Sequence, residues 1–232
     1  MNRKITIAID GFSSTGKSTV AKKLAKELGY VYVDTGAMYR AVTLFAMRNS
    51  LVSSQGVDEK GLIEKLPEVN LKFIFDEKRG FAAMYLNGED VEDEIRQMEV
   101  SGNVSKVATI SEVRQKLVSQ QQLMGKEKGI VMDGRDIATV VFPDAELKLF
   151  MTASPDERAT RRFKELQSKG QEVSYEEVLK NVEDRDLMDT TREDSPLVMA
   201  EDSIEIDNSF LNPEDQFKIV LELAREMIEQ EN

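Results

Sequence analysis

The sequence predicts an α/β fold in which a parallel sheet of about five strands carries helices on both faces. Short apolar runs rich in β-branched residues alternate with stretches whose apolar residues recur at helical spacing. This alternation is typical of strand–helix–strand units, whose strands run parallel and are buried on both sides. The 232 residues suit one such domain with an insertion. The predicted strands cover residues 5–9, 30–33, 129–132, 146–151 and 203–207.

A loop with the pattern G-x-x-x-x-G-K-S follows the first strand and precedes a helix with an apolar stripe of Val20, Leu24 and Leu28. Such a loop points backbone N–H groups at an anion, and the helix N-terminus adds its dipole. Its Lys reaches the outer phosphates and its Ser hydroxyl faces Mg²⁺. The sequence therefore predicts a P-loop NTPase-type core that binds a nucleoside triphosphate. The loop residues are Gly11, Phe12, Ser13, Ser14, Thr15, Gly16, Lys17 and Ser18.

The composition limits the chemistry that this core can perform. The chain has no Cys and no His, which excludes disulfides, cysteine nucleophiles, imidazole bases and the common zinc sites. A formal net charge of −12 disfavours a broad nucleic-acid or anionic-membrane surface. The apolar run near the N-terminus is too short for a signal sequence or a membrane span. We therefore expect a soluble, cytoplasmic protein that binds neither nucleic acid nor membranes.

A small β-containing insertion is expected at about residues 63–96, where the apolar period changes from helical to alternating. Residues 71–75 and 81–85 alternate as strands do, and Asn87-Gly88 is typical of a tight hairpin turn. Residues 50–66 look helical but weakly patterned, and two helical stretches follow the insertion, at about 97–108 and 111–127.

Two charged motifs lie at the ends of predicted strands, where parallel sheets bind ligands. In residues 34–40, Arg40 lies one turn into a helix and is placed to clamp a second phosphate. The alternative is a helix N-cap at Thr35 beside a solvated Arg. In residues 133–136, Asp133 is placed to support the shell of Mg²⁺, and the alternative is a charged surface turn.

Residues 155–195 are dense in charge, and two sets of side chains share a helix face by their spacing. Three like charges on one face favour an anion between them, as in a mobile segment that delivers arginines to a transferring phosphoryl group. The alternative is a solvent-exposed helix rich in ion pairs. The first set is Arg158, Arg161 and Arg162, and the second is Arg185, Asp189 and Arg192.

These motifs closely resemble those of the bacterial cytidylate (CMP) kinases. The resemblance covers essentially the whole chain, including the insertion. Its most specific part is Asp-Gly-Arg-Asp followed by Val-Val-Phe-Pro, at which other nucleoside monophosphate kinases differ. The matching segments are residues 11–19, 34–40, 94–96, 133–136, 139–143 and 185–186.

The resemblance implies that the chain moves the γ-phosphoryl group of Mg-ATP to CMP, and to dCMP. We expect it to act as a monomer. The resemblance further implies a core of residues 1–40, 128–154 and 200–232, a monophosphate-binding region of residues 35–127, and an arginine-rich lid at about residues 155–195. The loop, with Thr19, would bind ATP together with the lid arginines Arg158, Arg161 and Arg162. Lys17, Arg158, Arg162 and Arg185 would be catalytic, and Ser18 and, indirectly, Asp133 would serve the metal.

The resemblance also assigns the CMP site. Ser105 and Arg114 have no local signal and are assigned by the resemblance alone. In the family, positions matching Ser105, Arg114 and Asp136 face the cytosine, and those matching Thr35, Arg40 and Arg135 surround the monophosphate. Positions matching Arg185 and Asp189 lie near the sugar, with Arg192 close to the nucleotide and Asp133 also at the CMP site.

Three positions depart from the family pattern, and none changes the expected reaction. Phe12 stands where many members have Pro, Thr35 where some have Ser, and Met188 where some have Arg, so we expect one lid contact of those relatives to be absent here.

Two alternative functions remain open. A P-loop kinase for a sugar acid or another monophosphate would share the loop, and a screen of acceptors would separate it. A GTP-dependent switch would need an Asn-Lys-x-Asp segment, which the chain lacks.

Overall fold

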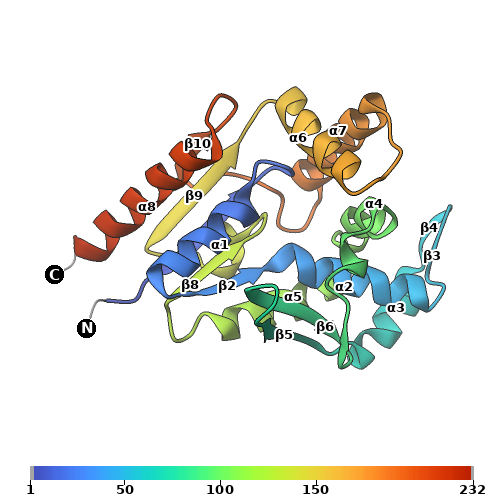
Figure 1. Cartoon of the computed structure of the whole chain (residues 1–232). Helices are drawn as coiled ribbons and strands as arrows, with labels where there is room; N and C mark the ends of the chain where they lie inside the picture. The colour runs from blue at the N-terminus through green and yellow to red at the C-terminus, as the bar shows by residue number, and fades with distance from the viewer. Residues whose placement is uncertain (1–2, 231–232) are drawn as a thin grey trace. The chain divides into compact units, whose positions relative to one another are not determined.

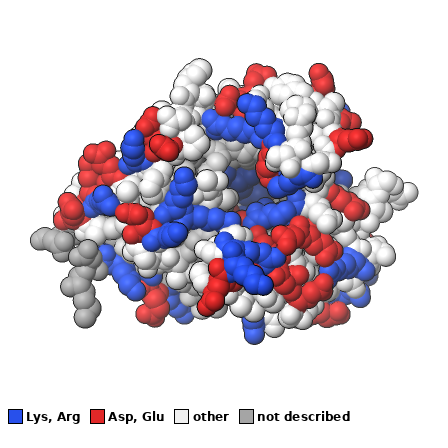
Figure 2. All heavy atoms as spheres, in the orientation of Figure 1, with Lys and Arg blue, Asp and Glu red and all other residues white. Residues whose placement is uncertain are grey.

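The computed structural model describes residues 3–230, which fall into two compact units. Unit 1 comprises the described residues up to Tyr32 and from Gly125 onward, and unit 2 is Val33–Met124. Over the face shown in Figure 2, Lys and Arg side chains are interspersed with Asp and Glu. Among residues 3–230, none of the helices has both the length and the apolar character needed to cross a membrane.

A five-stranded sheet with the order β10-β9-β1-β8-β2 organises unit 1 (Figure 1). β1 pairs in parallel with both β8 and β9, and β10 pairs in parallel with β9. This confirms the predicted parallel α/β sheet, in which the central strand β1 leads into the glycine-rich loop. The strands are β1 (Thr6–Gly11), β2 (Val31–Asp34), β8 (Ile130–Asp133), β9 (Leu147–Thr152) and β10 (Ile204–Asp207).

Two helices cover one face of this sheet, α1 (Lys17–Leu28) and α8 (Pro213–Glu229). Their apolar stripes share one buried core with Ile7 and Ile9 of β1. α8 begins as predicted, because the side chain of Asn212 accepts hydrogen bonds from two backbone N–H groups in the first turn. The unit also contains α6 (Pro155–Ser168), α7 (Tyr175–Thr191) and a single turn of π-helix, η3 (Ile137–Val141).

Unit 2 has its own apolar core, formed by its helices and a small antiparallel sheet of order β5-β6-β7. The alternating residues do form the predicted hairpin, with Leu71 opposite Leu86 in the β5–β6 pair. The elements are α2 (Thr35–Arg48), β3 (Val52–Ser53), β4 (Gly56–Val57), α3 (Glu59–Lys65), η1 (Leu66–Glu68), β5 (Leu71–Asp76), β6 (Phe81–Leu86), β7 (Glu89–Asp90), η2 (Glu94–Arg96), α4 (Met98–Val107) and α5 (Ser111–Met124).

The prediction of a helix over residues 50–66 is wrong for its first half. Residues 52–57 form the short hairpin β3–β4, and only Glu59–Lys65 is α-helical. Ser50 and Gly56 have φ angles of 58° and 132°, which an α-helix cannot include. The Asp58 side chain then accepts a hydrogen bond from the backbone N–H of Gly61 and starts α3.

Candidate active site

The loop between β1 and α1 has the backbone geometry of an anion-binding cradle. Gly11 has a φ of 140°, and a Cβ at this position would lie 2.0 Å from the carbonyl oxygen of Met151 on β9. Gly16 caps α1 in a left-handed conformation. Only glycine fits at Gly11, because β9 approaches the loop so closely. The backbone N–H groups of the loop and the N-terminus of α1 form the cradle.

Lys17 is buried in this loop, with 5% of its surface exposed. Its ammonium group donates a hydrogen bond to the carbonyl oxygen of Phe12 and lies 3.4 Å from the Thr15 hydroxyl. A phosphate in the loop would favour the charged form of this amine. Burial and the positive charge of Arg135 lower the pKa of Lys17 well below its ordinary value, against the opposite effect of the carboxylates of Asp133, Asp10 and Asp189.

Asp133 at the end of β8 joins α1 and β2 by hydrogen bonds. The Ser18 hydroxyl donates to Asp133 Oδ2 at 2.8 Å, and the Tyr32 hydroxyl donates to Asp133 Oδ1 at 2.8 Å. A Ser hydroxyl next to one carboxylate fits Mg²⁺, which is held by few protein oxygens together with waters and substrate phosphates. Within residues 3–230 there is no cluster of three or more Asp or Glu that would hold a metal by itself.

The segment after β8 is buried, so the alternative of a charged surface turn is wrong. Asp133 and Asp136 are each 4% exposed. Asp10, on β1, accepts hydrogen bonds from the backbone N–H groups of Ile137 at 2.9 Å and Ala138 at 2.7 Å. Burial raises the pKa of Asp10 to about 7, with a smaller contribution from Asp136, although the two N–H groups and Lys17 act against it. Asp10 thus fixes the start of η3 directly after Asp136.

Three of the predicted CMP-site residues are arginines that lie around the carboxylate of a fourth, Asp189 on α7. Arg135 Nε donates to Asp189 Oδ2 at 2.8 Å, and Arg192 Nη1 lies 3.9 Å from Asp189 Oδ1. Burial alone raises the pKa of Asp189, but Arg135, Arg185 and Arg192 outweigh it and hold that pKa below its ordinary value. The structure therefore brings Arg135, Arg185, Asp189 and Arg192 into one charged cluster.

Each of the three arginines of α6 has a polar partner within unit 1. Arg158, which is 2% exposed, forms a bidentate ion pair with Asp186 and stacks 5.1 Å from the centre of the Phe12 ring. Arg162 Nη1 lies 2.9 Å from Glu165. Each guanidinium thus has its own partner within the protein, and an anion between the three stays a prediction. The role of these arginines toward ATP stays a prediction.

Arg161 is linked to the loop through the buried side chain of Asn208. Its guanidinium donates to the Asn208 side-chain oxygen at 2.9 Å and to the Asn208 carbonyl at 2.8 Å. Asn208 Nδ2 in turn donates to the carbonyl oxygen of Thr15 at 2.6 Å. Arg161 thus supports the loop from the end of β10.

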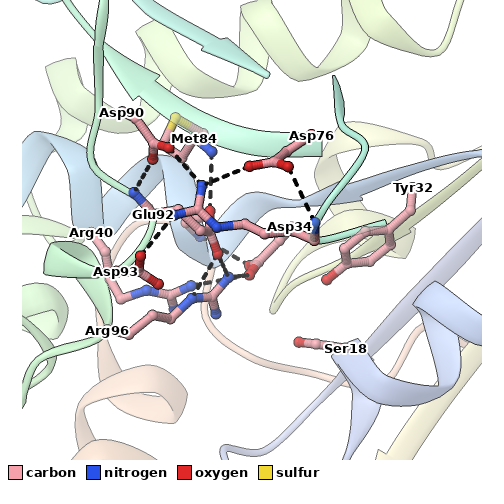
Figure 3. A network of polar contacts seen from close by, with 12 residues as sticks. Ser18, Tyr32, Asp34, Arg40, Asp76, Met84, Asp90, Glu92, Asp93 and Arg96 are labelled. Atoms are coloured by element: carbon pink, nitrogen blue, oxygen red, sulfur yellow. Dashed lines mark hydrogen bonds and ion pairs between the residues drawn. The ribbon is translucent and has the colours of Figure 1, made fainter. Parts of the chain in front are cut away.

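In unit 2, the α2 N-cap is Asp34 rather than Thr35, so the predicted alternative of a Thr35 cap is wrong. Asp34 Oδ1 accepts from the backbone N–H of Ala37 at 2.9 Å. Asp34 Oδ2 accepts from Arg40 Nη2 at 3.0 Å and from Arg96 Nη2 at 2.8 Å (Figure 3). Arg40 is therefore held against the first turn of α2 and is not a solvated side chain. Thr35 is buried at the first position of the helix.

The two residues that only the resemblance assigned are buried in unit 2. Arg114 on α5 is 2% exposed, donates to the carbonyl oxygen of Ala108 at 3.1 Å and stacks 5.6 Å from the centre of the Tyr39 ring. Ser105 on α4 is buried as well. Burying a guanidinium is costly unless polar and ring contacts offset it, as the Ala108 carbonyl and the Tyr39 ring do here, and the roles of Arg114 and Ser105 toward CMP stay predictions.

Four residues hold parts of the site in place by hydrogen bonds, and the sequence did not predict a role for any of them. Asp10 fixes η3, Tyr32 holds Asp133, Asn208 holds the loop, and Arg96 holds Asp34. Arg96 lies in a segment that resembles the family, and that was the one sequence signal for it. Asp10 immediately precedes the glycine-rich loop, and an Asp inside an apolar strand was a signal for it.

Comparison with known proteins identifies the family. The family model for cytidylate kinase matches residues 7–226. The cytidylate kinase of Flavobacterium johnsoniae is 67% identical over 226 residues, covering 97% of this chain and 98% of that protein. That of Phocaeicola vulgatus is 55% identical over 220 residues, covering 95% and 96%. An uncharacterized protein from Eubacterium ventriosum shares the fold alone, with a TM-score of 0.50 and 12% identity over 96% of this chain and 99% of that one. The chain belongs to the cytidylate kinase family.

Proposed function

We propose that the protein transfers the γ-phosphoryl group of ATP to CMP, giving CDP and ADP, and that it also accepts dCMP. The observation that carries the proposal is the 67% identity to a cytidylate kinase over 97% of the chain. The loop geometry, the buried Lys17 and the Ser18–Asp133 pair support it, because phosphoryl transfer needs alignment and charge neutralisation more than a strong base. An anionic phosphate oxygen needs no deprotonation, which agrees with a chain that has no His.

The donor site consists of the loop and its supports. Residues 11–19 would hold the ATP phosphates, with Lys17 opposite the β- and γ-phosphoryl oxygens. Bound Mg²⁺ would neutralise charge that develops on those oxygens. The Ser18 hydroxyl would hold the ion, and Asp133 would orient that hydroxyl by accepting a hydrogen bond from it. The same nucleotide would be bound by three lid arginines, Arg158, Arg161 and Arg162. The transferring group would be stabilised by Arg158, Arg162 and Arg185.

The acceptor site would use guanidinium groups for phosphate and a polar set for cytosine. Bidentate guanidinium contacts suit a monophosphate, so Arg40 and Arg135 would hold it with Thr35. Asp136 and Arg114, with Ser105, would complement the donor and acceptors on the cytosine edge. Arg185, Asp189 and Arg192 would lie near the sugar, and Asp133 would contribute at the same site. Residues 155–195 would act as the lid and residues 35–127 as the monophosphate-binding region.

We further propose that the enzyme works as a cytoplasmic monomer. All residues of the proposed site lie on this one chain, and both proposed substrates are water-soluble nucleotides, which supports this proposal. Size-exclusion chromatography with light scattering measures the mass of the purified protein and would give that of one chain.

Coupled measurement of ADP release tests the proposed function. The purified protein is given ATP, Mg²⁺ and one acceptor at a time, namely CMP, dCMP, UMP, AMP, GMP or a sugar acid. We expect kcat/KM to be highest for CMP and dCMP. A preference for the sugar acid or for a purine monophosphate would reject the proposal in favour of another P-loop kinase activity.

A further inference from the structure

Unit 2 contains a network of two carboxylates and two guanidiniums around the N-terminus of α2 (Figure 3). Arg96, on η2, donates to Glu92 Oε1 from both Nε, at 3.1 Å, and Nη2, at 2.6 Å. The same Nη2 donates to Asp34 Oδ2 at 2.8 Å. Arg40 Nη2 donates to that same Asp34 oxygen at 3.0 Å. Arg96 therefore bridges two carboxylates, one of which also holds Arg40.

Both carboxylates are buried, so their charges need partners. Asp34 and Glu92 are each 4% exposed. Glu92 Oε2 accepts from the backbone N–H of Met84 at 3.0 Å, which fixes this carboxylate to β6. Burial by itself raises the pKa of Asp34, but Arg40 and Arg96 outweigh it and hold that pKa well below its ordinary range. The network thus contains two negative and two positive charges and is balanced only while Arg96 is present.

Loss of Arg96 would change the charge around Arg40. The carboxylates of Asp34 and Glu92 would both remain buried, with Arg40 as the guanidinium still in contact with Asp34. Because an unbalanced buried anion attracts any nearby cation strongly, Arg40 would be drawn further onto Asp34. A guanidinium drawn onto a carboxylate attracts an incoming phosphate less.

We propose that Arg96 is a positioning residue for the acceptor monophosphate: it neutralises Glu92 and shares Asp34, so that these carboxylates do not cancel the charge that Arg40 presents to CMP. This inference rests on the proposed function, in which Arg40 holds the acceptor phosphate. It gives the insertion a role in substrate affinity, because Glu92 and Arg96 come from the segment that follows its hairpin.

Two variants separate this role from its alternatives. Arg96→Met removes the guanidinium and leaves Glu92 charged, whereas Arg96→Met combined with Glu92→Gln removes both charges of the pair. We expect Arg96→Met to raise KM for CMP about tenfold, with kcat and KM for ATP changed by less than about threefold. In the double variant we expect KM for CMP to return to within about threefold of the wild-type value. Calorimetric titration of CMP without ATP should show the same order of affinities.

Arg48→Met is a matched control. Arg48 also bridges two carboxylates of unit 2, Glu89 and Glu94, at 2.6 to 2.9 Å, and Glu94 lies on the same turn η2 that carries Arg96. Arg48 has no described contact with Asp34 or Glu92. Because Arg48 and both of its partners are exposed, we expect this variant to lose little stability and to keep KM for CMP within about twofold of the wild-type value.

Three results would overturn the inference. In folded Arg96→Met, an unchanged KM for CMP would reduce Arg96 to a structural role. An equal rise in Arg48→Met would show that any lost ion pair of unit 2 has this effect. A KM for CMP in the double variant as high as in Arg96→Met would show that Arg96 itself touches the phosphate.

If Arg96→Met does not fold, Arg96→Lys carries the same test. Lys keeps the charge but cannot serve both carboxylates with a planar fork, so KM for CMP should rise about threefold, and no rise would overturn the inference. The wild-type protein assayed in parallel keeps the two proposals distinguishable. No turnover of CMP by the wild type would reject the proposed function. Normal wild-type turnover with an unchanged KM in the variants would reject only the role of Arg96.

Discussion

At the scale of single residues, Lys17 carries the most direct electrostatic role. Its ammonium group is buried and turned onto the carbonyl oxygen of Phe12, inside the loop that would hold the ATP phosphates. Lys17→Ala should leave the fold intact and reduce kcat about 10²- to 10³-fold, because one preorganised charge opposite the γ-phosphoryl group is lost. Coupled ADP release measures this loss. Lys26→Ala, in the last turn of the same helix, is the control and should keep normal turnover.

A folded Lys17→Ala protein that keeps more than about a tenth of the wild-type kcat would contradict the role given to Lys17. Circular dichroism and thermal melting of the variant and its control establish that both are folded.

At the scale of the elements, the first turn of α2 fixes where Arg40 lies. A Cβ at Gly36 would be 2.9 Å from Arg40 Nη1 and 3.1 Å from Asp34 Oδ1. Gly36→Ala should therefore push the guanidinium away from its place over the helix N-terminus and raise KM for CMP about tenfold, with KM for ATP unchanged. Steady-state kinetics with each substrate varied in turn measures both constants.

Gly102→Ala on α4 is the matched control for Gly36→Ala, since a Cβ there would meet nothing within 4 Å. This variant should keep both KM values. Equal KM values for CMP in the wild type and Gly36→Ala would mean that Arg40 does not depend on the space at Gly36.

Elements set by local sequence could be predicted, and those set by distant contacts could not. The strand, glycine-rich loop and helix at residues 5–28 are encoded by neighbouring residues, and the structure confirms them. The hydrogen bonds of Asp10 to Ile137, of Tyr32 to Asp133 and of Arg96 to Asp34 join residues 127, 101 and 62 positions apart. No local pattern reports such contacts. The hairpin at residues 52–57 was missed because residues 50–66 have a weak apolar pattern, which does not report the positive φ angles at Ser50, before the hairpin, and at Gly56, within it.

The arginines of α6 show the same limit within one element. Helical spacing placed Arg158, Arg161 and Arg162 together, and the spacing itself is right, because all three lie on α6. Their partners Asp186 and Asn208 come from α7 and from the end of β10, which spacing within one helix cannot reveal. Which partner each of these arginines contacts therefore had to come from the structure.

At the scale of the whole molecule, Asp10 links stability to pH. Its folded-state pKa is raised to about 7 from an ordinary value of 3.8, so between these values the folded protein holds a proton that the unfolded chain has released. The free energy of unfolding contributed by this group therefore falls as pH rises from about 4 to 7, by at most about 4 kcal/mol, and is constant above. Asp10→Asn removes this dependence.

Urea unfolding of the wild type and Asp10→Asn at several values between about pH 5 and pH 8 tests this linkage. Subtracting the variant removes the contribution of groups that titrate alike in both proteins. The difference, wild type minus variant, should decrease as pH rises and then level off. A difference that stays constant or increases would mean that Asp10 is ionised in the folded protein throughout this range.

The choice of base is the central claim of this account. Cytosine presents an exocyclic amine, which a carboxylate can accept from, whereas uracil presents a carbonyl there and sets two acceptors face to face. An unpaired buried polar group costs about 1–3 kcal/mol, which predicts a tenfold to hundredfold preference for CMP over UMP. Asp136→Asn can donate to the uracil carbonyl and should lose CMP activity while narrowing that preference.

The ratio of kcat/KM for CMP to kcat/KM for UMP, measured in the folded wild type and in Asp136→Asn, tests this claim most directly. We predict a ratio of at least about ten in the wild type and a clearly smaller one in the variant. A ratio that is unchanged or larger in Asp136→Asn would show that Asp136 does not read the base and would contradict the account of the acceptor site.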